Sequence, residues 1–352
     1  MFSRLPFSFM FLFVMITGTL LSLSSSHWLG IWAGLEINLI GFLPLLVYQK
    51  SMMESESGVK YFIIQALGSA LLMFGSLSMY SLFFTWEMSK ISSIYLVGMM
   101  IISCGLCMKM GLFPFHFWLP SVMAGLPWMS CLLLATWQKL APLFLISLLM
   151  EVNSIYWFVL VFCVISAGSS LMGGIGGMNQ TQVRSLLAYS SIGHLGWLVF
   201  ACLYGDWLMK IYLFIYILIS LCIFISLYYS NLSMMKDLNN LGNQYYSELG
   251  IMVMLLSLGG LPPLLGFISK LLVVLSSMNG SMWGILFILI MGSLMSLFYY
   301  LSLFFSLVLN KIKSNGKLNH IYLISNNLLS LGLLINLMGG LMLMTTGIIE
   351  NI

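Results

Sequence analysis

Apolar segments long enough to cross a lipid bilayer follow one another along nearly the whole chain, separated by short polar breaks. A helix needs about 20 apolar residues to span the hydrocarbon core. Because lipid offers no hydrogen-bonding partner to open backbone, each of these segments is expected to be helical. The sequence predicts eleven spans, at residues 7–23, 28–48, 60–84, 92–119, 125–149, 154–172, 183–204, 208–230, 246–277, 281–309 and 321–348.

Charged residues are correspondingly scarce. Of the 352 residues, 61% are hydrophobic and only 6% are charged, whereas an ordinary soluble domain has about 25% charged residues. These figures exclude both a water-exposed globular protein and a disordered chain. The longest polar breaks, at about 50–59, 231–247 and 310–320, are too short for a soluble domain. Residues 1–352 are therefore predicted to form a single all-α, polytopic transmembrane domain.

The basic residues outside the spans or at their ends predict the orientation of the chain. An odd number of spans puts the two termini on opposite sides of the membrane. The N-terminal side then holds Arg4, Lys50, Lys60, Arg184, Lys236, Lys311, Lys313 and Lys317, whereas the other side holds Lys90 and Lys210. By the positive-inside rule, the N-terminal side is the cytoplasm or the mitochondrial matrix. No basic patch alternates with aromatic residues, so no nucleic-acid partner is expected.

Two of the spans are overlong and are interrupted by proline, which should break each helix near mid-membrane. The span at 92–119 contains Gly111-Leu-Phe-Pro114, and the span at 246–277 contains Gly260-Leu-Pro262-Pro263. Proline removes a backbone donor and clashes with the preceding turn, so both helices should break. The breaks lie five spans apart and cross in opposite directions. This pattern is typical of an antiporter-like inverted repeat, here roughly 7–149 and 154–309, with 321–348 as an extra C-terminal helix.

Four charged residues fall inside predicted spans and away from their ends: Glu36, Lys109, Lys139 and Lys270. Each costs about 2.5–3.5 kcal/mol at a helix centre, so the four together cost roughly 10–14 kcal/mol, comparable to the stability of a domain. Such groups must pair, contact water or lose their charge. Burial favours a neutral lysine and a nearby carboxylate favours a charged one, so a Glu36–Lys109 pair predicts a proton switch. The alternative is a static ion pair that locks two helices together.

Other polar residues in the spans are weaker candidates. His116, just after the first break, and His194 are candidate proton relays, because imidazole titrates near neutral pH. The alternative for each is a hydrogen-bonded core histidine. Candidates for ordering water are Ser190, Ser191 and Asn38. The glycine-rich stretch 173–177 lacks the strand and spacing of a dinucleotide site and is predicted to be a loop. Cys104-x-x-Cys107 has no second cysteine pair, so no metal or cluster site is predicted.

At this point the motifs match a known family. The chain resembles chain 2 of NADH:ubiquinone oxidoreductase, the mitochondrially encoded, antiporter-like subunits of respiratory complex I. The densest matches are Lys109-Met-Gly-Leu-Phe-Pro-Phe-His-Phe-Trp-Leu-Pro120 and Thr136-Trp-Gln-Lys-Leu-Ala-Pro142. Further matches are Ser25–Trp28, Gly34–Asn38, Lys60–Phe62, Asn179–Thr181, Ala188–Ile192, His194–Trp197 and Leu258–Pro263 with Gly266 and Phe267.

The resemblance implies the antiporter-like fold with eleven helices. It also implies that Glu36 and Lys109 form a coupled pair, that Lys139 is a central relay and that Lys270 is the terminal proton site. The chain would bind no cofactor itself, since NADH, FMN, the iron–sulfur clusters and ubiquinone belong to other subunits. Its expected partners are the other membrane-arm subunits and bilayer lipid, with cardiolipin as a candidate, and protons are its only small-molecule substrate.

The sequence therefore predicts a proton-translocating subunit of complex I in the mitochondrial inner membrane. Its N-terminus would face the matrix and its C-terminus the intermembrane space. Quinone reduction elsewhere in the complex would drive the pump, so the chain belongs to an NADH:ubiquinone reductase without having a redox centre. Two alternatives are a stand-alone cation/proton antiporter and a purely structural membrane scaffold. Transport by the purified chain alone separates the first, and pumping after loss of Lys139 separates the second.

Overall fold

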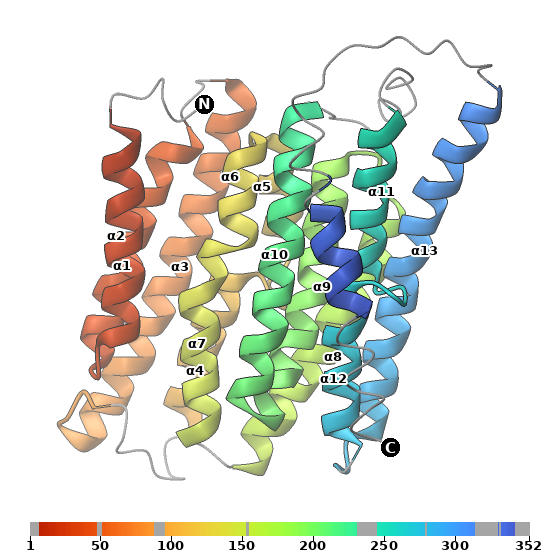
Figure 1. Cartoon of the computed structure of the whole chain (residues 1–352). Coiled ribbons are helices and arrows are strands. Elements are labelled where there is room, and N and C mark those ends of the chain that lie inside the picture. The colour runs from red at the N-terminus through yellow and green to blue at the C-terminus, as the bar shows by residue number, and fades with distance from the viewer. Residues whose placement is uncertain are drawn as a thin grey trace. The chain divides into compact units, whose positions relative to one another are not determined.

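The computed structural model describes residues 7–47, 51–87, 96–152, 155–230, 245–278, 280–313, 330 and 332–341. Within these residues the chain is helical apart from short connections and one isolated β-bridge between His27 and Glu87. The helices, shown in Figure 1, are α1 (Ser8–Ser24), α2 (Trp28–Leu46), α3 (Met52–Phe83), α4 (Leu96–Met110), α5 (Trp118–Gly125), α6 (Trp128–Ala135), α7 (Trp137–Val152), α8 (Tyr156–Met178), α9 (Val183–Tyr204), α10 (Asp206–Ser230), α11 (Tyr245–Gly259), α12 (Leu265–Ser277) and α13 (Trp283–Lys313), followed by a helical segment at 332–341.

The helices agree closely with the predicted spans, and the all-α membrane class is confirmed. α9 matches the span predicted at 183–204, and the ends of α1, α2 and α10 differ from prediction by no more than two residues. Seven helical stretches of the described residues are long and apolar enough to cross a membrane, and shorter apolar helices accompany them. Eleven crossings and the orientation stay predictions. Arg4, Lys50, Lys90, Lys236 and Lys317 lie outside the described residues.

The chain divides into two compact units, residues 1–165 (unit 1) and 166–352 (unit 2), with the division inside α8. In unit 1, α3 packs against α2, α4 and α5, and α7 packs against α4 and α6. Aromatic rings fill the contact between α2, α3 and α5: the Tyr61 ring lies 5.3 Å from that of Phe42 and 5.8 Å from that of Trp118. This packing holds the charged groups of α2 and α4 on a common scaffold.

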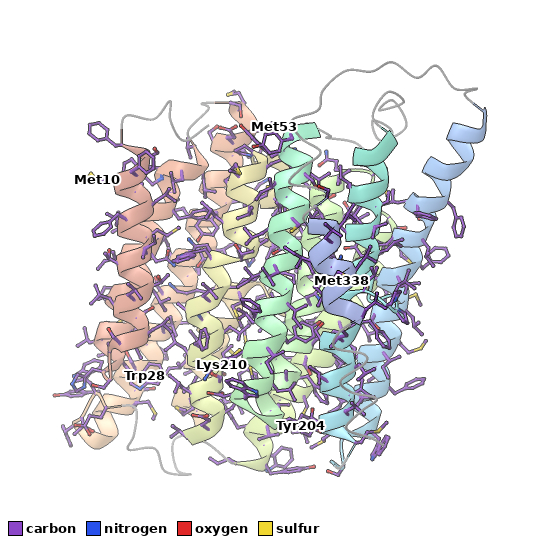
Figure 2. All side chains as sticks on the ribbon, viewed as in Figure 1. Met10, Trp28, Met53, Tyr204, Lys210 and Met338 are labelled. Carbon is purple, nitrogen blue, oxygen red and sulfur yellow. The ribbon has the colours of Figure 1, made fainter. Side chains whose placement is uncertain are left out.

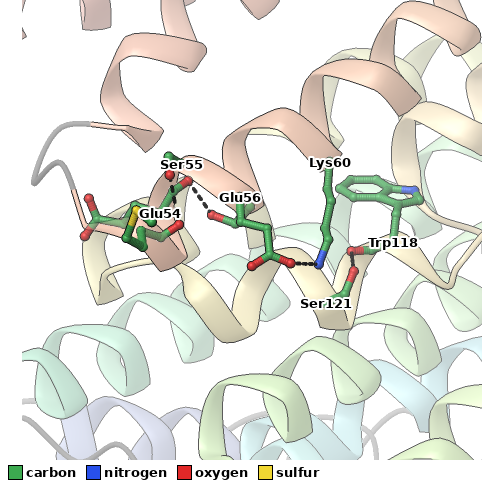
Figure 3. Close-up of polar contacts among 8 residues, drawn as sticks. Glu54, Ser55, Glu56, Lys60, Trp118 and Ser121 are labelled. Atoms are coloured by element: carbon green, nitrogen blue, oxygen red, sulfur yellow. Dashed lines mark hydrogen bonds and ion pairs between the residues drawn. The ribbon is translucent and has the colours of Figure 1, made fainter.

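The helix α3 begins eight residues before the span predicted at 60–84. Ser51 explains the early start, because its hydroxyl oxygen accepts a hydrogen bond from the backbone N–H of Glu54, 3.2 Å away, and so caps the helix. One turn later, Lys60 forms an ion pair with Glu56 at 2.6 Å (Figure 3). Both side chains of this pair are exposed. The first turns of α3 therefore carry solvent-facing charge, which a span prediction based on hydropathy leaves out.

In unit 2, α9 is buried along most of its length. The helices α10, α12 and α13 pack against it, and α11 packs against α10, α12 and α13. His194 lies on α9 and Lys270 on α12. The two predicted site residues of this unit are therefore carried by neighbouring helices.

The prediction of a loop at 173–177 is wrong, because this glycine-rich stretch forms the last turns of α8. Here glycine allows close helix packing rather than chain reversal. A methyl group on Gly173 would come within 2.5 Å of the backbone nitrogen of Gly193 on α9, and one on Gly176 would overlap the Tyr189 ring. Small residues let membrane helices approach in this way. The gain from packing outweighs the low helix propensity of glycine.

Many large apolar side chains are exposed on the two units. They include Met10, Met53 and Met338, which are 61%, 69% and 52% exposed and project from their helices in Figure 2. In water, apolar surface of this extent favours association. In a bilayer the same surface contacts lipid or neighbouring subunits, which agrees with the membrane class of the chain.

Candidate functional site

The first predicted helix break lies between α4 and α5, as expected from Pro114. α4 closes with Gly111, whose φ of +77° is left-handed and favours glycine. The N–H of Leu112 donates to the carbonyl of Cys107 at 3.1 Å, and the N–H of Gly111 donates to that of Met108 at 3.3 Å. This pair of hydrogen bonds is a Schellman motif, which ends a helix cleanly.

Lys109 lies in the last turn of α4, directly before this break, and its side chain is only 6% exposed. Its aliphatic stem packs over Gly68 of α3, where an added methyl group would come within 3.1 Å of the Lys109 Cγ. Side chains satisfy the nearby terminal carbonyls of α4. Gln65 donates to the Lys109 carbonyl at 3.2 Å, and the Trp118 indole donates to the Met108 carbonyl at 3.2 Å. A cation at this position also suits the negative end of the helix dipole.

Glu36 lies mid-way along α2 and is half-buried. It is close enough to interact electrostatically with Lys109 and Tyr61. Among the described residues of unit 1, however, Glu36 and Lys109 form no ion pair, and Oε1 of Glu36 is buried without a hydrogen-bond partner. The static ion pair is therefore not what this structure holds. The carboxylate is a neighbour of the lysine with unused hydrogen-bonding capacity, which a water molecule or a moving lysine can take up.

Lys139 lies in the first turn of α7 and is 4% exposed. A third interruption, which the sequence did not predict, stands just before it. α6 ends at Ala135, and Thr136 adopts φ −113° and ψ −69° before α7 begins. Pro142, inside α7, removes the N–H that would bond to the carbonyl of residue 138, so the first turn of α7 also lacks one regular hydrogen bond.

Asn38 and Gln138 join α2 to α7 through their side-chain amides. Asn38 Nδ2 donates to Gln138 Oε1 at 2.9 Å, and Gln138 Nε2 donates to Asn38 Oδ1 at 3.1 Å. The expectation that Asn38 orders water stays a prediction, because the pairing with Gln138 uses only one of the two N–H groups of its amide. The pair lies two residues from Glu36 and one from Lys139 in sequence, so it fixes the two helices that carry these charges.

The second predicted break lies between α11 and α12 and closes in the same way as the first. Gly260 has a left-handed φ of +86°. The N–H of Leu261 donates to the carbonyl of Leu256 at 3.4 Å, and the N–H of Gly260 donates to that of Ser257 at 3.1 Å. The two breaks therefore share one backbone motif. They differ in the place of the lysine: Lys109 precedes its break and Lys270 follows its own.

Lys270 reaches back across the second break. Its Nζ donates to the carbonyl of Gly259 at 2.8 Å and to that of Leu258 at 3.3 Å, and the side chain is 8% exposed. These carbonyls belong to the last turn of α11, where a helix leaves acceptors without intrahelical partners. The C-terminal end of α11 therefore provides a partly negative seat for the ammonium group.

Lys270 and His194 both line a small cavity within unit 2, about 10 Å³ in volume. The Nδ1 atom of His194 lies 3.0 Å from the Tyr212 hydroxyl. Hydroxyl groups of α9 and α13 supply most of the remaining polar lining. They belong to Ser190, Ser293, Ser296, Tyr299 and Tyr300.

The α13 residues of this lining were not predicted from the sequence, although a signal was present. Residues 293, 296 and 299 or 300 recur at helical spacing, which places them on one face of α13. Within the described residues, the hydroxyls of Tyr299 and Tyr300 are buried and lie near each other, and that of Tyr300 lies near Ser190, but neither makes a hydrogen bond of good geometry. Buried polar groups of this kind are ordinarily satisfied by water. The cavity is about large enough for a single ordered water molecule beside Lys270.

His116 lies in the first break and is 1% exposed. Its Nδ1 atom is 3.2 Å from the Pro114 carbonyl, and its ring centroid lies 4.1 Å from that of Phe117. Its Nε2 atom is buried and finds no partner among the described residues. The arrangement leaves one ring nitrogen of His116 available to accept or donate a proton.

Comparison with known proteins agrees with this architecture. Residues 25–296 match the family described as the NADH:quinone oxidoreductase/Mrp antiporter transmembrane region. The chain is 40% identical to NADH-ubiquinone oxidoreductase chain 2 of Lumbricus terrestris over 296 residues, covering 83% of this chain and 84% of the relative. It is 39% identical to the protein of the same name from Anopheles gambiae over 348 residues, covering 95% and 96% of the two chains.

A solved structure extends the comparison to the fold. A chain of respiratory complex I from Thermus thermophilus, solved with bound aureothin, superposes with a TM-score of 0.81 at 25% identity, covering 95% of this chain and 78% of that one. The family match spans well over half of this chain, and the alignments with the two relatives cover most of the length of each relative. The chain therefore belongs to the NADH:quinone oxidoreductase/Mrp antiporter transmembrane family, in the group of NADH-ubiquinone oxidoreductase chain 2 proteins.

Proposed function

We propose that the chain is a membrane-arm subunit of NADH:ubiquinone oxidoreductase in the mitochondrial inner membrane and translocates protons through its buried charged residues. Its relatives carry the name of that enzyme, and its solved neighbour is a chain of respiratory complex I. In this proposal the N-terminus faces the matrix, and the NADH, FMN, iron–sulfur and ubiquinone chemistry belongs to other subunits. The chain converts their conformational signal into proton movement.

The observation that carries the proposal is the position of Lys270, a buried amine held by the terminal carbonyls of a broken helix beside a polar cavity. An ammonium donates stronger hydrogen bonds to carbonyls than a neutral amine does. The two carbonyls therefore hold the proton-loaded form of Lys270. His194 and the hydroxyls of α13 line the cavity into which a released proton passes by way of water.

Unit 1 supplies a second switch. Glu36 lies near Lys109 without pairing with it. Closure of this gap stabilises the charged lysine, and reopening it favours release of the proton. Lys139, on α7, is the intermediate carrier, and the amide pair of Asn38 and Gln138 holds its helix beside that of Glu36.

Replacement of Lys139 by Met tests the proposal, because methionine keeps much of the length of the side chain and removes its titratable group. We expect the assembled complex in proteoliposomes to pump fewer protons per electron. The matched control is Lys60→Met, which removes an exposed lysine paired only with Glu56. Undiminished pumping by the Lys139→Met complex, at equal NADH oxidation, contradicts a transport role for this chain.

A second candidate function is cation/proton antiport by the chain alone, favoured by the presence of Mrp antiporters in the matched family. The purified chain in liposomes, under an imposed sodium or potassium gradient, distinguishes the two functions. The subunit function predicts no proton flux. Flux that depends on the cation gradient and is lost in Lys139→Met supports the antiporter instead.

A further inference from the structure

The 332–341 helix contacts the second break, between α11 and α12, through the buried side-chain amide of Asn336. Asn336 is 2% exposed. Its Oδ1 atom accepts a hydrogen bond from the backbone N–H of Leu265, 3.1 Å away, and its Nδ2 atom lies 3.2 Å from the sulfur of Met254. Leu265 is the first residue of α12, the helix that carries Lys270.

The first N–H groups of a helix have no intrahelical acceptor and are usually capped by the residue just before the helix. α12 is preceded by Leu264, which has no side-chain acceptor, and it has no local side-chain cap. Asn336 supplies the missing acceptor from 71 residues away in sequence. The break thus receives its cap from a separate helix of unit 2.

Two glycines let the 332–341 helix approach closely enough for this hydrogen bond. A methyl group on Gly340 would overlap the carbonyl of Pro263 in the break, and one on Gly339 would come within 2.9 Å of the Leu265 side chain. The approach of backbone to backbone leaves little room for the break to shift. The contact of Asn336 is therefore part of a fitted surface over residues 263–265.

The two ends of the break are closed by different groups. On the α11 side, Lys270 donates to the carbonyls of Leu258 and Gly259. On the α12 side, Asn336 accepts from Leu265. The first closure weakens when Lys270 loses its proton, because a neutral amine is a poorer donor. The second closure does not depend on the charge of Lys270, so it maintains the start of α12 in both states.

We propose that Asn336 is a positioning residue for Lys270: it caps α12 from the 332–341 helix and fixes the amine against the last turn of α11. The cap is independent of the proposed function, whereas its effect on pumping rests on it. Without the cap, the start of α12 would loosen and the distance from Lys270 to its two carbonyls would vary.

Hydrogen–deuterium exchange of the assembled complex tests the cap directly. We expect the Leu265 amide to exchange about tenfold faster in Asn336→Leu, because a buried N–H then lacks its acceptor. Asn336→Asp keeps an acceptor oxygen, which the helix N-terminus favours, and should restore slow exchange. Ile335→Ala changes an adjacent, 52% exposed side chain and should leave the exchange unchanged. Equal exchange in Asn336→Leu and in the unmodified protein overturns the cap.

Proton pumping tests the positioning role. Asn336→Leu should lower the number of protons pumped per electron and shift its pH profile, and Asn336→Asp should recover both. If Leu265 exchanges faster but pumping and its pH profile are unchanged, while Lys270→Met lowers pumping, Asn336 is a cap without a positioning role. If Lys270→Met itself pumps normally, the proposed function fails and the positioning role with it, whereas the exchange result still decides the cap.

Discussion

The amide pair between Asn38 and Gln138 should be energetically coupled, and a double-mutant cycle can measure this coupling. Each single replacement by leucine leaves the partner amide without its two hydrogen bonds. A buried amide left without its partner costs about 1–3 kcal/mol. Asn38 is 3% exposed, but Gln138 is only part-buried, so water replaces some of the loss. We therefore expect about 1–2 kcal/mol for each single variant.

The double variant Asn38→Leu/Gln138→Leu should be far less destabilised than the sum of the single variants. Removing both partners leaves no unsatisfied amide and places apolar groups of similar size in contact. Because the coupling energy is the difference between the double variant and the sum of the two single variants, it is then about 2–4 kcal/mol. Local opening of α2 and α7 should accordingly be about 5–30-fold more frequent in each single variant, and close to normal in the double variant.

Hydrogen–deuterium exchange of the assembled complex measures this opening in peptides from α2 and α7. The double variant Asn38→Gln/Gln138→Asn, in which the two residues swap positions, serves as the control, because it retains an amide on each helix. Single-variant effects that add within about 0.5 kcal/mol in the double variant would show that the amides are not coupled. The proposed role of this amide pair in holding α2, which carries Glu36, against α7, which carries Lys139, would then be refuted.

Two further predictions concern helix packing and the first break. Gly176→Ala should reduce the amount of folded subunit in the membrane, because the added methyl group meets the Tyr189 ring. The control Gly284→Ala meets no atom within 4 Å and should be tolerated. Immunoblots of the assembled complex compare the two variants, and equal amounts of subunit would contradict the close packing at Gly176. Gln65→Leu should leave the Lys109 carbonyl without its side-chain donor and destabilise the end of α4 by about 1–3 kcal/mol. Unchanged amide hydrogen exchange around residues 107–112 would show that Gln65 does not stabilise the end of α4.

Local signals explain why both helix breaks could be predicted. Proline and glycine act on the backbone within a few residues, and both α4 and α11 end at a Gly-Leu pair that is followed within two residues by proline. The interruption at Thr136 was missed, because no glycine or proline lies at that position, and Pro142, six residues on, predicts at most a bend. The helicity of 173–177 depends on the fit of α8 against α9 and α13, which glycine content alone does not reveal.

In the candidate site, too, local features could be predicted from the sequence and contacts between helices could not. A charge inside an apolar span is visible in the sequence, and Glu36, Lys109, Lys139 and Lys270 could be named on that basis. That Glu36 and Lys109 form no ion pair in the described residues could not be predicted, since pairing depends on the spacing of the helices. The hydrogen bond of Asn336 to the Leu265 N–H joins residues 71 positions apart, so no local sequence pattern predicts it.

The most direct test of the account is the proton-to-electron ratio of the assembled complex after removal of the amine at the second break. Lys270→Met should lower the ratio at an unchanged amount of complex, because the carbonyls of Leu258 and Gly259 lose their proton-bearing donor. Lys210→Met is the matched control, since Lys210 is exposed and lies 3.8 Å from Asp206. A ratio equal to that of the control would contradict proton transfer through this chain at Lys270.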